Sequence, residues 1–323
     1  MAESRLDKRR VGLQGDAPSD LASTTMIWLG NRRGYLADWI TQRWVQFTGR
    51  RVRFSDLPWL DGPVGDTRGI GRTFFETYAT RHGLRAVRSS TPRGLLLHFR
   101  ELAGPHFDPG QVHPAVARFY EETSEYTLDA WSQWCGAFRP FGSLLALLFS
   151  RRLQQLNVPL SPLDTSHGIT SEVVELRDAA TGDRVAAVWI RELIGTQNLL
   201  YAGSYSVTDV PGFAGRCVKV VFPLPNGNCV VVMKPSVDKE GSFTVSSVGR
   251  QFGDPGFYFT VHAGDGNGWA RYVRTLRESI RVDAGGDAVL YARHDLWIWR
   301  TRFLRLHYRL ARSRVRERLP NST

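Results

Sequence analysis

Residues 216–235 read RCVKVVFPLPNGNCVVVMKP, two apolar β-branched runs around Pro225-Asn226-Gly227-Asn228. Asn-Gly between two such runs favours a two-residue hairpin turn, because both central residues of a type I′ turn need positive φ. We therefore predict an antiparallel hairpin with Asn226-Gly227 at its tip. One face of this hairpin is wholly apolar and should point to an interior. The other face sets Lys219 opposite Lys234, a like-charged pair that solvent or a bound anion would have to relieve.

The same two-residue period continues on both sides of this hairpin, from about Thr170 to Leu310. Apolar and polar residues alternate between turn-forming clusters of Gly, Asp and Asn, which is typical of an antiparallel sheet. The last strand is the clearest, because apolar residues at 304, 306, 308 and 310 alternate with charged ones. Roughly eight or nine strands of this kind are enough for a strongly curved sheet or a closed barrel. The further strands are expected at 172–177, 185–193, 199–207, 243–248, 257–262, 277–282 and 288–299.

The first half of the chain has the period of helices instead. Apolar residues recur at helical spacing over 35–48, Gly83 is placed to end a helix over 72–82, and Pro114 is placed to begin another. The whole of 111–160 looks helical, including a stripe over 141–152. The predicted fold class is α+β, a helical N-terminal half packed on a large antiparallel, barrel-like sheet. Four regions are expected: a disordered N-terminal segment 1–25, a mainly helical region 26–160, a sheet region 165–312 and a basic tail 313–323.

The charge of the chain is concentrated at its ends. The net charge of the 323 residues is +11, and residues 300–318 hold eight arginines against one glutamate, so the body of the chain is close to neutral. A nucleic-acid-binding protein would show a basic surface on its body, and we therefore do not expect a nucleic-acid partner. Hydrophobic residues make up 42% of the chain and charged residues 23%, which is ordinary for a globular protein.

Cysteines and targeting signals give further expectations. Cys135, Cys217 and Cys229 are scattered without a CxxC motif, so we expect neither a disulfide framework nor a metal site. The N-terminus has no apolar signal core, and the longest apolar run, 144–149, is too short to span a bilayer. We therefore expect a cytoplasmic protein. The sequence contains no P-loop, no GxSxG motif and no dinucleotide fingerprint, and we expect no cofactor.

A second hairpin, around Gly285-Gly286, places charges on an apolar face. A turn centred there pairs Glu278 with Arg293 and places Asp295 on the same face, beside the apolar Ile280. Charges that point inward must be paired or must serve a ligand, so a structural ion pair and a binding site are both open. A register change of one residue would move these side chains to the other face. The glycine-rich connection 249–256 is either the mouth of a cavity or an ordinary long turn.

Four stretches carry a resemblance to a known group of proteins. They are HPAV at 113–116 followed by FYE at 119–121, the Asn-Gly hairpin, FGDPGFYF at 252–259 and LHYR at 306–309. With these, residues 110–310 resemble an uncharacterised bacterial protein family. No activity is assigned to that family, so the resemblance implies no particular chemistry.

The functional expectation follows from the fold class. We predict that the protein binds, or binds and transforms, a small, largely apolar molecule in a pocket between sheet and helices. The alternative is a non-enzymatic peripheral membrane or partner-binding protein that uses the aromatic residues at 297, 299 and 303 and the arginine-rich C-terminus. Whether the chain is an enzyme, and its oligomeric state, are left open. The candidate ligand-binding residues are Glu278, Arg293, Asp295, Arg250 and Tyr258.

Overall fold

The computed structural model describes residues 36–136, Phe138 and residues 169–313, apart from residues 66, 68–69, 72, 89–90, 195–198 and 287. Its helices are α1 (Leu36–Thr48), α2 (Phe74–Arg81) and α3 (Pro114–Glu121), which confirms the three predicted helix positions that fall in this part. The N-terminal segment predicted to be disordered, the helical stripe predicted over 141–152 and the tail beyond residue 313 lie outside the described residues.

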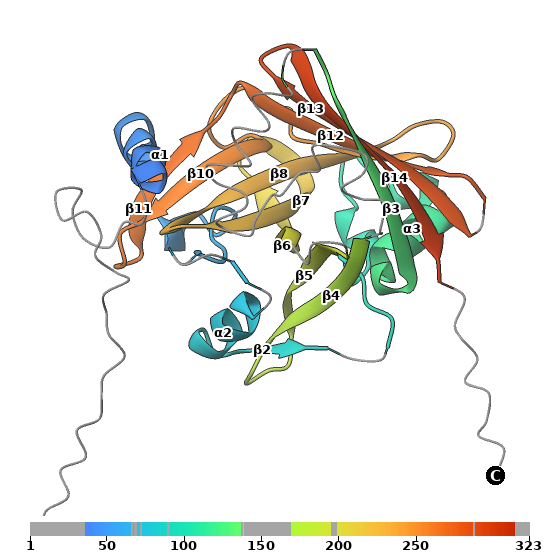
Figure 1. Cartoon of the computed structure of the whole chain (residues 1–323), viewed down its shortest axis with the longest axis horizontal. Coiled ribbons are helices and arrows are strands. Elements are labelled where there is room, and N and C mark those ends of the chain that lie inside the picture. Colours follow the sequence, from blue (N-terminus) through green and yellow to red (C-terminus); the bar gives the residue numbers. More distant parts are fainter. Residues whose placement is uncertain are drawn as a thin grey trace, which may run out of the picture.

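A closed antiparallel barrel dominates the molecule (Figure 1). Around the barrel the order is β8-β7-β6-β5-β4-β3-β14-β13-β12-β9, and β9 pairs with β8 to close the ring. The predicted α+β class with a barrel-like sheet is thereby confirmed. The ten strands are β3 (Tyr126–Trp134), β4 (Ile169–Asp178), β5 (Arg184–Leu193), β6 (Leu199–Val210), β7 (Phe213–Leu224), β8 (Gly227–Val237), β9 (Phe243–Ser246), β12 (Leu276–Ala284), β13 (Val289–Ile298) and β14 (Thr301–Arg312).

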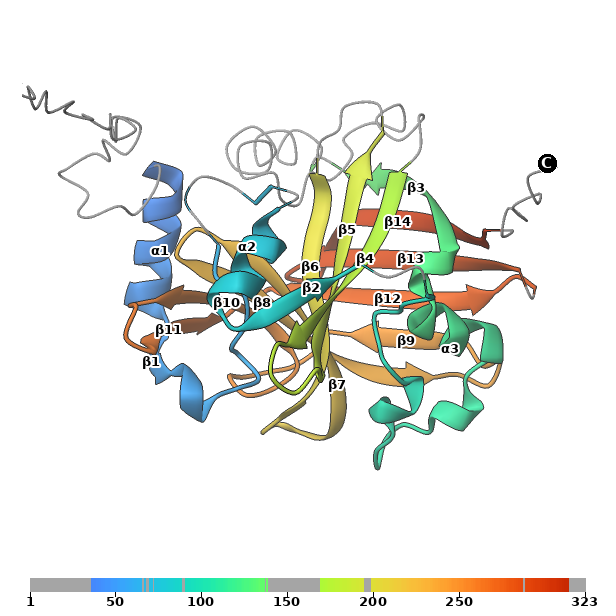
Figure 2. The ribbon, with the colours of Figure 1, turned by 90° about the horizontal axis from the view of Figure 1, so that it is seen from below.

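Strand β8 pairs with two different strands along the edge that faces away from β7. Its second half pairs with β9, whereas its first half pairs with β10 (Gly256–His262). From β10 the sheet continues through β11 (Asn267–Tyr272) to β1 (Arg50–Arg53), so a flap of three strands extends the barrel on the side of α1 (Figure 2). A further short strand, β2 (Leu84–Val87), pairs with β4. The barrel wall is therefore extended on one side by the three strands β10, β11 and β1, and β2 is added beside β4.

In the described part of the chain, the seam between β3 and β4 has fewer paired residues than any other pair of neighbouring strands in the ring. Among the described residues, Leu128 and Ile169 are the one backbone pairing between these strands, whereas β3 pairs with β14 along its whole length. The expectation that all of 111–160 is helical is wrong for 126–134. The stretch YTLDAWSQW alternates with the period of a strand, and Tyr126 and Leu128 are buried on its inner side.

The Asn-Gly hairpin forms, but its tip lies one residue earlier than predicted. Leu224 pairs with Gly227, so the central turn residues are Pro225 and Asn226. The proline ring fixes a negative φ, and Asn226 has a φ of 58°, which is the pattern of a type II turn rather than type I′. The pairing slides by two residues, an even number, so the apolar face still points inward.

This slide separates the two lysines that were expected to face each other. Lys219 lies opposite Val232, not Lys234. Its Nζ donates to the backbone carbonyls of Pro58, at 3.2 Å, and Asp61, at 3.1 Å. Burial lowers the pKa of this lysine, and the carbonyl oxygens compensate part of the lost hydration. The lysine therefore fastens the loop after β1 to the barrel wall.

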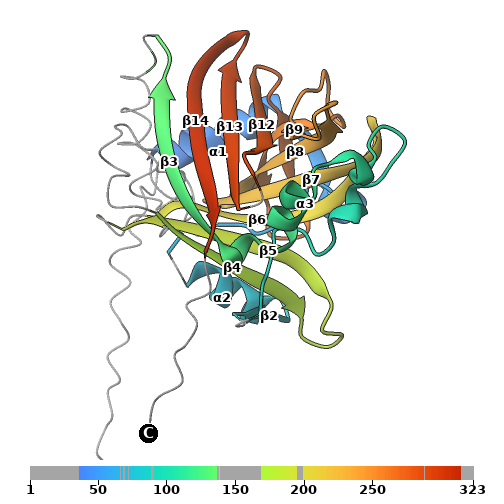
Figure 3. The same ribbon diagram turned by 90° about the vertical axis from the view of Figure 1, so that its right-hand side faces the viewer.

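Helices and loops close the two ends of the barrel. At one end, the His113 backbone N–H donates to Gly241 of the β8–β9 turn at 2.9 Å, and Tyr120 of α3 packs against Phe243. At the other end, Gln42 of α1 donates from Nε2 to the Pro225 carbonyl at 3.2 Å. Figure 3 shows α3 in front of the barrel and α1 behind it, with α2 below β4 and β5. The interior is thus capped by α1 and α3.

Helix α1 has an unexpected orientation. The polar residues Asp38 and Gln42 are buried against the barrel, whereas Ile40 is 54% exposed and Phe47 84% exposed. The apolar face predicted for this amphipathic helix consequently points outward. The inward face carries Val45 beside these polar residues, and Gln42 satisfies the Pro225 carbonyl at the hairpin tip, a backbone group that needs a hydrogen-bond partner.

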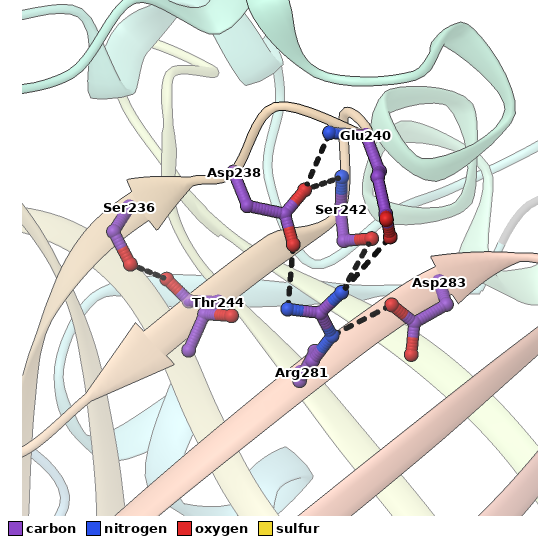
Figure 4. A network of polar contacts seen from close by, with 7 residues as sticks. All are labelled: Ser236, Asp238, Glu240, Ser242, Thr244, Arg281 and Asp283. Carbon is purple, nitrogen blue, oxygen red and sulfur yellow. Dashed lines mark hydrogen bonds and ion pairs between the residues drawn. The ribbon is translucent and has the colours of Figure 1, made fainter.

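A polar network on the outside fastens the barrel where it closes (Figure 4). Arg281 of β12 donates from Nη1 to Asp238 at 2.6 Å and from Nη2 to the Ser242 hydroxyl at 3.0 Å. Its Nε binds Asp283 at 2.7 Å. Asp238 also accepts from the backbone N–H groups of Glu240 and Ser242. The β8–β9 turn is therefore tied to the strand that β9 must reach to complete the ring.

Candidate functional site

The inside of the barrel holds a cavity of about 610 Å³. Its walls are the inward faces of the strands, such as Val218 and Val220 of β7 and Leu306 of β14. Phe119 and Tyr120 of α3 lie at one end, and Gln42 of α1 lies at the other. The lining is mostly apolar with a few polar groups, which is the usual composition of a small-molecule pocket.

The hairpin between β12 and β13 has a different register from the prediction. Glu278 lies opposite Leu296 rather than Arg293, a shift of three residues. The connection runs from Gly285 to Ala288, which is four residues instead of two. A shift by an odd number exchanges the two faces of one strand relative to the other. The expected pairing of Glu278 with Arg293 is therefore wrong, although Glu278 does line the cavity.

Arg293 and Asp295 lie on the outer face of β13. The Arg293 side chain is 50% exposed, and its Nε lies 3.4 Å from Asp295. Asp295 is buried at the wall, where Arg305 of β14 binds it from Nε at 2.5 Å and from Nη2 at 3.0 Å, and Arg302 lies 3.8 Å away. These four side chains form a structural ion cluster outside the barrel, and the expectation that Arg293 and Asp295 face the interior is wrong.

The two remaining candidates also lie away from the cavity. Arg250 is exposed in the β9–β10 connection, where its backbone N–H donates to Asp254 at 2.8 Å. Tyr258 is fully buried, but on the opposite face of β10, because its neighbours Phe257 and Phe259 are the ones that line the cavity. Its hydroxyl donates to the Asp254 carbonyl at 2.5 Å. This connection is an ordinary turn held by its own hydrogen bonds.

A histidine–carboxylate pair faces the cavity from β12 and β13. His294 Nε2 lies 3.0 Å from Glu278 Oε2; the Glu278 side chain is buried and that of His294 is partly buried. The two residues are brought together because Ile280 and His294 are paired and Glu278 is two positions along the same face. Such a pair can accept or donate a proton at a polar atom of a bound molecule. The sequence contained His294, but only the observed register places it beside Glu278.

A buried arginine that the sequence did not single out also lines the cavity. Arg191 of β5 lies with its guanidinium carbon 3.9 Å from the ring centroid of Trp189, 4.5 Å from Tyr201 and 5.3 Å from Tyr308. The hydroxyls of Tyr201 and Tyr205 are hydrogen-bonded to each other. The signal was present as a charged residue inside the apolar run 185–193, but its partners come from β6 and β14.

Burial keeps these tyrosines protonated. Desolvation raises the pKa of Tyr205 to about 12, and it raises those of Tyr201 and Tyr308 as well. Burial opposes the charge of Arg191, but the surrounding tyrosines raise its pKa, so it stays cationic. Burial also raises the pKa of the Cys229 thiol in the cavity wall, which makes it a poor nucleophile. The cavity thus offers neutral hydroxyls and one permanent cation.

No family model matches this chain, and no solved structure matches it. Among curated proteins it is similar to an uncharacterised membrane protein, YndJ, of Bacillus subtilis (strain 168). The identity is 25% over 245 residues, which cover 73% of this chain and 43% of the relative. The chain therefore spans less than half the length of this relative, and the likeness supports the resemblance to an uncharacterised bacterial family.

The relative's name bears on the location expected from the sequence. That protein is named a membrane protein, and this finding contradicts the expectation of a cytoplasmic protein. In the described part of the chain, the helices are too short or too polar to cross a membrane.

Proposed function

We propose that this protein binds a small, largely apolar molecule inside the barrel. The observation that carries the proposal is the cavity of about 610 Å³ between α1 and α3. Protein interiors are normally close-packed, and an empty apolar cavity of this size loses packing contacts along its whole lining. A ligand would restore those contacts, and the volume suits a drug-sized molecule. Glu278 and Arg191 would orient its polar atoms.

A titration with the neutral apolar fluorophore N-phenylnaphthylamine tests this proposal. Wild type should give saturable binding at one site. Ala292 lines the cavity from β13 and is buried, so Ala292→Trp should fill part of it and weaken binding at least about tenfold. Val185 is 52% exposed, and Val185→Trp is the matched control, which should leave the affinity unchanged. The absence of saturable binding to wild type would refute the proposal, as would equal losses in both variants.

We keep peripheral contact with an anionic lipid surface as a second candidate, because of the exposed face of α1. Leu36, Ile40, Trp44 and Phe47 form one apolar stripe, and the exposed Arg43 lies on the same helix. Apolar side chains with nearby arginines are typical of helices that lie in a membrane interface. The relative's name, a membrane protein, supports the same candidate.

The sequence placed this membrane contact at the aromatic residues near the C-terminus, and the described residues there support it only in part. Trp299 is exposed at the β13–β14 turn, whereas Phe303 lines the cavity and packs against Trp134. Vesicle sedimentation tests whether α1 makes the contact with the lipid surface. Binding to phosphatidylglycerol vesicles should fall at least about fivefold in Ile40→Ser/Phe47→Ser. It should be unchanged in a control with two exposed residues away from α1, Val185→Ser/Val248→Ser. Equal partitioning of both variants would refute a role for α1.

A further inference from the structure

Arg191 is a buried cation without an acidic partner. It is 7% exposed, its Nε has no hydrogen-bond partner, and none of the ion pairs among the described residues includes it. Burying an unpaired charge is costly, and the faces of Trp189, Tyr201 and Tyr308 offset only part of that cost. An anionic group in the cavity would supply the missing partner.

We infer that the molecule bound in the barrel is an amphiphile with a carboxylate headgroup held by Arg191, an inference that rests on the proposed function. A guanidinium binds a carboxylate through two parallel hydrogen bonds, and such charge-assisted bonds are the strong ones. The apolar body of the ligand would then fill the space along Val218, Val220 and Leu306.

The tyrosines around Arg191 complement the same headgroup. In the hydrogen bond between the Tyr201 and Tyr205 hydroxyls, one hydroxyl donates and the other accepts. The accepting hydroxyl keeps its own proton for a third group. Burial raises the pKa of both residues, so both hydroxyls stay protonated at neutral pH, and the accepting hydroxyl can donate its one uncommitted proton to an anion. The surroundings of Arg191 are therefore rich in donors.

The other charges of the cavity do not take the place of this anion. In the described part of the lining the acids are Asp38 of α1, at one end of the barrel, and Glu278, which His294 engages at 3.0 Å on the β12–β13 wall. No ion pair among the described residues joins either of them to Arg191. Arg191 is on β5, and its guanidinium lies over the ring of Tyr308 of β14, on the far side of the seam between β3 and β4. One guanidinium matches the single charge of a carboxylate, whereas a phosphate monoester would bring about two charges and leave one buried without a partner.

Competition for the bound fluorophore by four matched amphiphiles tests the inference. They are dodecanoate, dodecanol, dodecyl phosphate and dodecyltrimethylammonium, the three ionic ones used below their micelle concentrations and dodecanol below its solubility limit. Wild type should bind dodecanoate about ten- to a hundredfold more tightly than dodecanol, as expected for a charge-assisted hydrogen-bond pair. Arg191→Met keeps an unbranched side chain but removes the guanidinium, and it should abolish this preference while leaving the dodecanol affinity within about twofold. Arg293→Met removes an outward arginine and should change neither affinity.

The outcomes separate this inference from the proposed function. If wild type binds the fluorophore and dodecanol but shows no preference for dodecanoate, the cavity is a binding site and Arg191 is structural. If wild type binds none of the ligands, the proposed function fails and the headgroup assignment fails with it. A preference for dodecyl phosphate over dodecanoate would also overturn the assignment. Should Arg191→Met not fold, the ligand series on wild type decides the question alone.

Discussion

The ion cluster on the outside of the barrel gives a quantitative test of the observed strand register. In the structure, Asp295 is coupled to Arg305 by two hydrogen bonds of 2.5 and 3.0 Å. The register expected from the sequence would couple Glu278 to Arg293 instead. Two double-mutant cycles, one for each pair, therefore distinguish the registers.

The magnitude follows from burial. The Asp295 side chain is 9% exposed and that of Arg305 21% exposed, so the pair lies between a surface ion pair and a buried one. Surface pairs contribute about 0.2–1 kcal/mol, whereas removing one partner of a buried pair costs about 3–5 kcal/mol. We expect Asp295→Ala to destabilise the fold by about 2–3 kcal/mol, with a coupling to Arg305 of about 1–2 kcal/mol. Glu278 and Arg293 should show a coupling within about 0.5 kcal/mol of zero, because they lie on opposite faces.

Urea denaturation followed by tryptophan fluorescence measures both cycles. The free energies of unfolding of wild type, the four single variants and the two double variants give the two coupling energies. A coupling of Glu278 to Arg293 above about 1 kcal/mol, together with none between Asp295 and Arg305, would refute the register and the description of the cavity.

Three further predictions concern thiols, pH and a glycine. Cys217 and Cys229 are buried, and burial raises the pKa of the Cys217 thiol to about 12, so both should resist a thiol reagent in the native protein and react in denaturant. The folded state holds the Tyr205 proton more tightly than the unfolded state, since burial raises its pKa from 10.0 to about 12. That contribution to stability is complete below pH 10, and urea titrations should show its loss as the pH rises from 10 towards 12. A Cβ at Gly227 would lie 1.9 Å from a backbone carbonyl oxygen of β10, so Gly227→Ala should cost about 1–3 kcal/mol by thermal denaturation, whereas Gly71→Ala, which meets open space, should cost less than about 1 kcal/mol.

The strands of the sheet could be predicted because their evidence is local. Alternation in the last strand placed Leu304 and Leu310 inward, and the structure confirms this. Closure of the barrel could not be predicted in the same way. It depends on β3, whose residues were assigned to a helical region, and on the pairing of β9 with the second half of β8. Both contacts join segments that lie far apart along the chain.

The candidate site was predicted less well than the fold, because the register of a hairpin decides which of its residues face the interior. The turn chemistry of Gly285-Gly286 gave the hairpin, but a loop of four residues instead of two exchanged the faces. Glu278 kept its inward position, whereas Arg293 and Asp295 did not. Arg191 lies within an apolar run of the sequence. Its contact with the ring of Tyr308 could not be predicted, because it depends on closure of the barrel.

The central claim, that the barrel interior is a binding site for an apolar molecule, is tested most directly by nuclear Overhauser effects from a bound ligand to methyl groups. Along β7 the cavity is lined by Val218 and Val220, while Val221 packs on the opposite face, as does Val230 of β8. With dodecanol bound to methyl-labelled protein, we predict contacts to Val218 and Val220 and none to Val221 or Val230. Contacts to the outward pair, or to exposed methyls alone, would contradict the claim.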